Sequence, residues 1–190
     1  MCLRATARGF AALPLALVAC TSPEWGPGEP ERFAGPASSE AYAVGVVADD
    51  DGGVLYVCGT TDASRPRSEW LDIDAEGRIT TRGTTTERGR ADVSDSGVSG
   101  TVSLVDGSEV SFSVPLVTDL ELGLFSVVDS GCRSGVVAYP GGSAGTWCSS
   151  DGRFEQVTPI QPIDGGALLV QIASQLRRLR VDAVDAATFR

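Results

Sequence analysis

The sequence predicts an all-β fold, a compact antiparallel barrel or sandwich of about ten short strands. From Tyr42 onward, short runs rich in Val, Ile, Thr, Tyr and Phe are separated by turns rich in Asp, Gly and Ser. No long stretch of this part sustains a helical hydrophobic period. At 190 residues the chain is long enough to bury a hydrophobic core as one domain.

The first predicted strands form three hairpins. Residues 41–48 pair with 54–59 across "DDDGG", and residues 68–74 pair with 78–83 across "AEG". Residues 98–105 pair with 109–116 across "DGS", where Asp106-Gly107 is a dipeptide typical of tight hairpin turns. This part of the chain therefore predicts strands that pair with their neighbours in the sequence.

Further strands are predicted in the second half of the chain. Residues 122–128 lead through "DSGCRSG" to 136–139, and 146–150 and 154–160 follow after "PGGSAG". Residues 167–173 and 177–184 form a last pair, with an amphipathic helix over Ser174–Ala187 as the alternative. A faint repeat, "SEWLDIDAEGRI" and "GTWCSSDGRF", suggests two related halves, although hairpins of this kind resemble one another in any case.

Missing residue types exclude several kinds of active site. The chain has no histidine and no lysine, and its 15 basic residues are all arginine, against 25 Asp and Glu. Without histidine there is no Ser-His-Asp triad, no Cys-His pair and no imidazole metal ligand. Without lysine there is no Schiff base and no P-loop lysine. The pI near 4.4 argues against binding nucleic acid, which needs clustered positive charge.

Residues 1–19 have the pattern of a secretory signal. Arg4 and Arg8 precede an apolar run over residues 10–19, which is shorter than the 20 or so residues that a membrane-spanning helix needs. Its end, "LVAC", resembles the lipobox of bacterial lipoproteins. The resemblance implies cleavage between Ala19 and Cys20 and a diacylglyceryl group on the Cys20 thiol. The alternative is an ordinary cleaved signal followed by a chance cysteine.

The lipobox resemblance implies a membrane anchor at Cys20. Two or three acyl chains anchor a protein stably, whereas a single chain does not. Thr21 stands where an inner-membrane retention signal would have Asp, which favours the outer membrane if the cell envelope has two. Residues 20–40 contain many Pro, Gly and Glu and predict a disordered linker, followed by a single β domain over residues 41–190.

Three cysteines remain beyond the lipobox: Cys58, Cys132 and Cys148. Export permits disulfides, and three thiols allow one intramolecular pair. Cys132 and Cys148 flank one predicted hairpin, so we expect this pair to form. The remaining cysteine, Cys58, is expected to be buried rather than reactive.

Several carboxylate patterns suggest chemistry, but each also has a structural explanation. Two Asp-Ser-Gly triplets, at Asp95 and Asp129, are similar to the catalytic loop of aspartic proteases, yet they lie too close together for two lobes and are also common turn sequences. "DIDAEGRI" begins like a calcium loop, but Gly83 occupies the position of the required Glu. We therefore expect no metal and no cofactor, and a carboxylate-dependent hydrolase is retained only as the second alternative.

Four aromatic residues suggest a ligand-binding alternative. Trp70 and Trp147 occupy matching places in the proposed repeat and, with Tyr56 and Tyr139, would stack on a sugar ring or another apolar ligand. The competing interpretation is that they are core residues, as large aromatics in small β proteins usually are.

Two longer stretches also resemble a known module. "LYVCG…EWLDIDAEGRI" with "VSGTVSLVDGSEVSFSVP", and then "GLFSVVDSGCRSGVVAYP…GTWCSSDGRFEQVTPI", are similar to an all-β module of unassigned function in exported proteins of GC-rich bacteria. The likeness covers residues 42–163 and transfers no site residue. The sequence as a whole predicts a lipid-anchored, non-enzymatic envelope protein whose partner is an unidentified envelope protein or a glycan.

Overall fold

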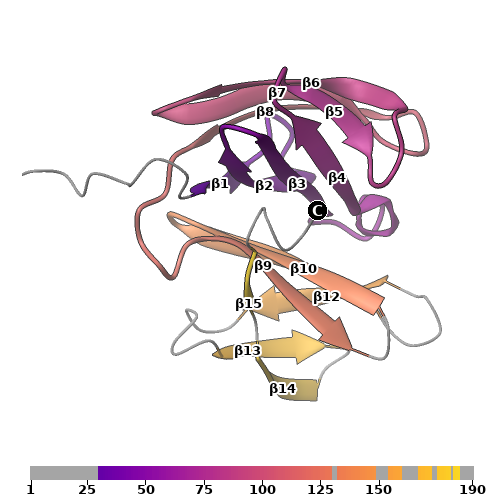
Figure 1. Cartoon of the computed structure of the whole chain (residues 1–190). Helices are drawn as coiled ribbons and strands as arrows, with labels where there is room; N and C mark the ends of the chain where they lie inside the picture. The colour runs from indigo at the N-terminus through magenta and orange to yellow at the C-terminus, as the bar shows by residue number, and fades with distance from the viewer. Residues whose placement is uncertain are drawn as a thin grey trace, which may run out of the picture.

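The computed structural model describes residues 30–129, 132–148, 154–159, 167–172, 175–180 and 182–184. The predicted signal peptide (1–19) and lipidation site (Cys20) lie outside these ranges. The predicted all-β class is confirmed: the described residues form fifteen strands in two antiparallel sheets, with one 3-10 turn at Arg65–Arg67. Figure 1 shows the two sheets stacked one above the other.

The first sheet is an eight-stranded meander in which every strand pairs with its neighbours in the sequence. Its strands are β1 (Glu31–Pro36), β2 (Tyr42–Asp49), β3 (Gly52–Gly59), β4 (Glu69–Asp74), β5 (Arg78–Thr81), β6 (Glu87–Ser94), β7 (Gly97–Ser103) and β8 (Glu109–Pro115). A bridge between Phe33 and Leu116 brings the last strand back to the first. The Val117 N–H also donates to the Arg32 carbonyl (2.8 Å), so the sheet is a nearly closed barrel.

Two barrel strands were not predicted. The linker predicted for residues 20–40 is wrong from Glu31 onward, because Glu31–Pro36 form β1 and the Phe33 side chain is fully buried. Strand β6 has mostly exposed side chains and is held in place by its ladders to β5 and β7. Both strands lack the period-2 apolar pattern that identifies a strand locally, since their position depends on the strands beside them.

The second sheet has seven strands in the order β14-β13-β12-β11-β10-β9-β15. Its strands are β9 (Gly123–Asp129), β10 (Cys132–Tyr139), β11 (Gly142–Cys148), β12 (Phe154–Pro159), β13 (Ala167–Ile172), β14 (Gln175–Arg180) and β15 (Asp182–Ala183). Strand β15 returns to pair with β9. The alternative of a helix over Ser174–Ala187 is therefore wrong for the residues described there. The two copies of the proposed repeat fall in different sheets, and their relationship stays a prediction.

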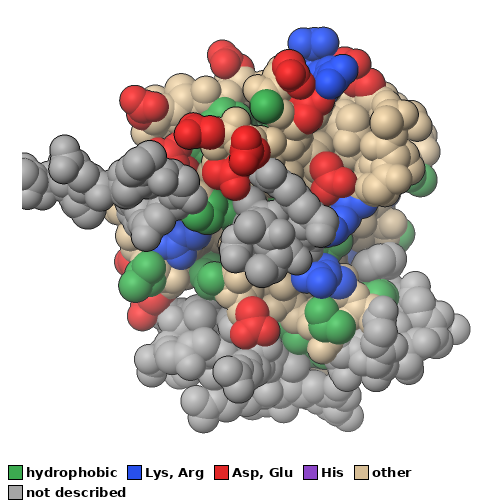
Figure 2. Space-filling view, viewed as in Figure 1, with side chains coloured by type: hydrophobic (Ala, Val, Ile, Leu, Met, Phe, Trp, Pro, Cys, Tyr) green, Lys and Arg blue, Asp and Glu red, His purple; other side chains and the backbone are tan. Residues whose placement is uncertain are grey.

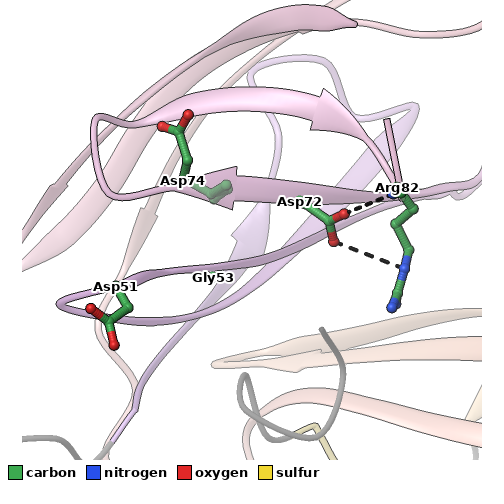
Figure 3. Close-up of a pocket in the computed structure, with 7 residues that line it drawn as sticks. Asp51, Gly53, Asp72, Asp74 and Arg82 are labelled. Carbon is green, nitrogen blue, oxygen red and sulfur yellow. Dashed lines mark hydrogen bonds and ion pairs between the residues drawn. The ribbon is translucent and has the colours of Figure 1, made fainter. Parts of the chain in front are cut away.

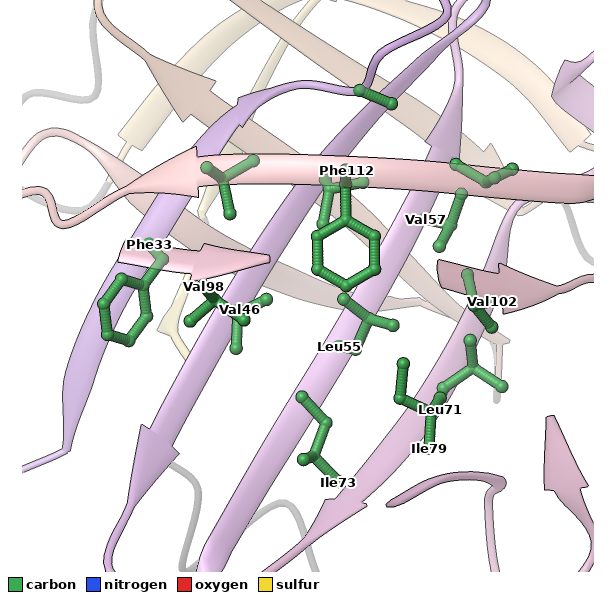
Figure 4. Packing of buried hydrophobic residues seen from close by; sticks show 14 of the residues in the cluster. Phe33, Val46, Leu55, Val57, Leu71, Ile73, Ile79, Val98, Val102 and Phe112 are labelled. Carbon is green, nitrogen blue, oxygen red and sulfur yellow. The ribbon is translucent and has the colours of Figure 1, made fainter. Parts of the chain in front are cut away.

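Among the described residues, the barrel interior holds the largest of three hydrophobic cores. Alternate residues of each strand point inward, as on β8, where Val110, Phe112 and Val114 are buried and their neighbours are exposed. Figure 4 shows Phe112 above Val46 and Leu55, with further aliphatic side chains from β4, β5 and β7 around them. This interdigitation fills the barrel with side chains, as expected of a small barrel.

A second core lies between the two sheets. The outer faces of β1, β2 and β3 pack against β9, β10 and β11 through buried residues, namely Ala34, Ala43, Val47, Val54, Tyr56, Cys58, Leu124, Val137 and Ala144. Strands β2 and β3 are therefore buried on both faces, which explains why they are continuous apolar runs in the sequence. A third core on the far side of the second sheet contains Phe125, Val136, Trp147, Val157 and Ile172.

Arg32 fixes the segment that joins the two sheets. From β1, its guanidinium donates hydrogen bonds to the carbonyls of Asp119 (3.3 Å), Leu120 (3.4 Å) and Leu122 (3.2 Å). Desolvation lowers the pKa of Arg32, while the nearby Asp119 carboxylate opposes the shift. Strand β1 thus contacts both the segment that closes the barrel and the segment that leads into the second sheet.

Candidate functional site

An open pocket of about 500 Å³ lies on the outside of the barrel wall. It is lined by Asp51, Gly53, Asp72, Ile73, Asp74, Arg82 and Gly83. Asp51 comes from the turn between β2 and β3, and Arg82 follows β5 (Figure 3). The pocket therefore combines three carboxylates with one guanidinium, all supplied by turns and by β4.

Asp74 is used to build the turn between β4 and β5. Its Oδ1 accepts the backbone N–H groups of Glu76 (3.0 Å) and Arg78 (2.8 Å), and its Oδ2 accepts Arg78 Nε (2.7 Å). Desolvation raises the pKa of Asp74, but the hydrogen bonds and charge of Arg78 outweigh it, so the pKa lies below its usual value. The carboxylate is thus held ionised by its own turn.

Asp72 binds the loop that follows β5. Its Oδ2 accepts the Gly83 N–H (3.2 Å), and its Oδ1 lies 3.9 Å from Arg82 Nε (Figure 3). Gly83 has a φ of +67°, a conformation that glycine adopts without strain. Among the described residues, no group of three or more His, Cys, Asp or Glu side chains is placed to hold a metal ion. The sequence that begins like a calcium loop forms a solvated hairpin.

Acidic side chains also gather where β1 begins (Figure 2). Desolvation, followed by the charges of Asp95 and Asp50, raises the pKa of Glu31 at this end of the barrel. Asp95 lies in the turn between β6 and β7, so its Asp-Ser-Gly triplet forms a turn as the structural interpretation predicts. The second triplet lies largely outside the described residues.

The predicted aromatic site of four residues is wrong as a set. Trp147 is 5% exposed in the core on the far side of the second sheet, whereas Tyr56 is buried in the core between the sheets, with Trp70 and Tyr139 partly buried against it. Successive side chains on a strand point to opposite faces, so Trp147 of β11 points away from the barrel while its neighbour Thr146 points toward it. Of the two alternatives, the structure supports core packing.

Tyr56 makes a specific contact between the two sheets. Its hydroxyl is hydrogen-bonded to Thr146 Oγ1, and its ring lies 4.3 Å from the Trp70 ring at an interplanar angle of 32°. Burial raises the pKa of Tyr56 well above its usual value. The ring also lies over Gly135 of β10, where an added Cβ would come within 2.3 Å of a ring carbon. Sequence reasoning missed both Thr146 and Gly135, because neither residue type marks a tertiary contact.

The predicted disulfide is confirmed. Cys132 and Cys148 are bonded across the ends of β10 and β11, with their Cα atoms 5.7 Å apart. Cys58, on β3, is fully buried, as expected for the unpaired cysteine. Desolvation raises the pKa of the Cys58 thiol to about 12, so it is protonated and unreactive in the folded state.

None of the helical structure among the described residues is long and apolar enough to cross a membrane. Comparison with protein-family models, with curated proteins and with solved structures found no match.

Proposed function

We propose that this chain is a bacterial lipoprotein, anchored to a cell-envelope membrane by acyl chains on Cys20, whose β domain serves as a non-enzymatic structural or interaction module. The observation that carries the proposal is the "LVAC" sequence at residues 17–20, which follows a basic and then an apolar segment. The partner is an envelope protein or a glycan.

Three features of the chain support this role. The Cys132–Cys148 disulfide is compatible with an exported protein, since such bonds persist in oxidising compartments. Two of the three carboxylates of the pocket are engaged in the turns that they build, with Asp74 bound to Arg78 and Asp72 bound to the loop of Arg82 and Gly83. The first described strand, β1, begins eleven residues after Cys20, so an extended tether would span about 40 Å at most.

The anchor is tested by substituting Cys20→Ser in cells that are fed a labelled fatty acid. The wild-type chain should incorporate the label and float with membranes, and C20S should do neither. Cys2→Ser is a matched control, because it removes the other cysteine of the N-terminal region and leaves the lipobox intact. Label incorporation into C20S would contradict the proposal, as would a wild-type chain without label.

The outer-membrane location is a separate part of the proposal and depends on Thr21. Thr21→Asp should shift the lipidated chain toward the inner membrane in a bacterium with two membranes, as measured by density-gradient fractionation. An unchanged distribution would contradict sorting by this residue without affecting the anchor.

A further inference from the structure

Cys58 lies in the core between the two sheets, on the same face of β3 as Tyr56. The two residues are two positions apart on the strand, and both belong to the core between the sheets. The Cys58 side chain is fully buried, and its Sγ lies 3.8 Å from the Gly59 carbonyl. Tyr139 of β10 is partly buried against the same core. Arg65 and Ser68, from the segment between β3 and β4, also face the thiol. The thiol is therefore covered by this segment and by β10 and β11, and movement of β10 and β11 away from β3 would uncover it on the side of the second sheet.

The disulfide lies next to the contact that holds these strands on the barrel. The ladder between β10 and β11 ends at the pair Gly135 and Thr146, the same two residues that receive the Tyr56 ring and hydroxyl. Beyond this pair, the strands are linked by the Cys132–Cys148 bond and by the Cys148 N–H, which donates to Ser134 Oγ (2.8 Å). Only one residue, Trp147, separates the cross-link from Thr146.

We propose that the Cys132–Cys148 disulfide acts as a redox-sensitive lock on this interface: its reduction releases the strand ends at Thr146 and Gly135 and exposes Cys58 while the barrel stays folded. A dithiol reductant supplies two electrons and two protons, becomes a cyclic disulfide, and leaves Cys132 and Cys148 as thiols. Cys132 stays paired with Asp129 of β9, and Cys148 stays paired with Phe154 of β12. Loss of the cross-link therefore separates β10 from β11 at their ends, where local opening is easiest.

The contacts of Tyr56 couple opening at the disulfide to exposure of the Cys58 thiol. When Thr146 moves, the Tyr56 hydroxyl loses its partner on the second sheet and keeps its contacts with Ser68 and Cys58. The loss weakens the one directional contact between the sheets that lies next to the thiol. Once solvated, the Cys58 thiol loses the desolvation that holds its pKa at about 12, and thiolate reactivity returns.

The test measures thiol labelling at Cys58 in the full-length chain. Oxidised wild type is compared with wild type reduced by a dithiol and with Cys132→Ser/Cys148→Ser, using peptide mapping to read Cys58 separately from every other cysteine. The reduced wild type and the double serine variant are the two lock-open forms. In both, Cys58 should be labelled at least about ten times faster than in oxidised wild type, and urea below the unfolding transition should not change that rate. The rate of amide hydrogen exchange in β7 and β8 should stay the same as in oxidised wild type.

Thr146 provides a test with the disulfide intact. Thr146→Val removes the partner that the Tyr56 hydroxyl has on the second sheet and should accelerate Cys58 labelling, whereas Thr146→Ser keeps a hydroxyl and should leave labelling slow. The proposal is overturned if the lock-open forms label Cys58 no faster than oxidised wild type. It is equally overturned if their acceleration rises with urea along the global unfolding line, because the thiol would then be exposed by unfolding of the whole domain.

Discussion

Tyr56 and Thr146 are 90 residues apart in the sequence and share a hydrogen bond in the core between the sheets. Tyr56 is 1% exposed and Thr146 is fully buried, so neither hydroxyl can exchange its partner for water. The pair therefore connects the barrel to the second sheet by a directional contact among buried apolar side chains. A contact of this kind fixes how the two sheets are positioned on each other.

Tyr56→Phe should lower the free energy of unfolding by about 1–2 kcal/mol, because the Thr146 hydroxyl would stay buried without its partner. Tyr42→Phe is the matched control, because the Tyr42 hydroxyl lies outside the interface core and bonds to the exposed Arg67 guanidinium, which water can solvate when the hydroxyl is removed. Urea unfolding followed by tryptophan fluorescence measures both variants. Equal losses in the two variants would show that the Tyr56 hydroxyl has no special role.

Gly135→Ala should destabilise the domain by about 1–3 kcal/mol, because its Cβ would overlap the Tyr56 ring. Gly107→Ala offers a contrast, since an added Cβ there meets nothing within 4 Å and only the positive φ of 83° opposes it. Combining Gly135→Ala with Tyr56→Ala should recover part of the loss if overlap is its cause. A purely additive double variant would argue against steric overlap.

Arg32→Ala should lower the free energy of unfolding by about 1–2 kcal/mol, since three carbonyls of the segment joining the sheets would lose their donor. Arg90→Ala removes a guanidinium whose side chain is 68% exposed and should change stability by less than about 0.5 kcal/mol. Hydrogen exchange at the Leu122 N–H, which bonds to the Asp119 carbonyl, should rise in Arg32→Ala only. An unchanged exchange rate would contradict the role given to Arg32.

Asp74 and Glu31 should give the stability of the fold opposite dependences on pH. The folded pKa of Asp74 is lowered, so its contribution is present above its unfolded pKa near 4 and is lost as the pH falls through the folded value. Asp74→Asn should therefore be less stable than wild type at pH 7, with a difference that shrinks in acid.

The folded pKa of Glu31 is raised, so ionised Glu31 opposes folding and stability recovers as the pH falls through that value. Glu31→Gln should therefore be at least as stable as wild type at pH 7. Urea unfolding of both variants between pH 3 and pH 7 measures the two trends. Trends of the same sign in Asp74→Asn and Glu31→Gln would contradict these assignments.

Local patterns predicted much of the barrel. Turn dipeptides such as Asp106-Gly107 and alternating apolar residues identified the hairpins of β2 and β3, of β4 and β5, and of β7 and β8. Strands β1 and β6 were not predicted, because apolar and polar residues do not alternate along them and the neighbouring strands determine their place. The aromatic site failed for a related reason, since the alternation of a strand does not say which of its two faces meets the other sheet.

By itself, the sequence determined the all-β class, the pairing of Cys132 with Cys148 and the burial of Cys58, because turn chemistry, hydrophobic period and cysteine spacing are local properties. Tertiary structure alone decided that eight strands nearly close on themselves and that a second sheet covers β1, β2 and β3. It also decided that Tyr56 meets Thr146 rather than a ligand. Contacts between residues about ninety positions apart depend on which faces the two sheets bury against each other, and that choice is made by the packing of the whole domain.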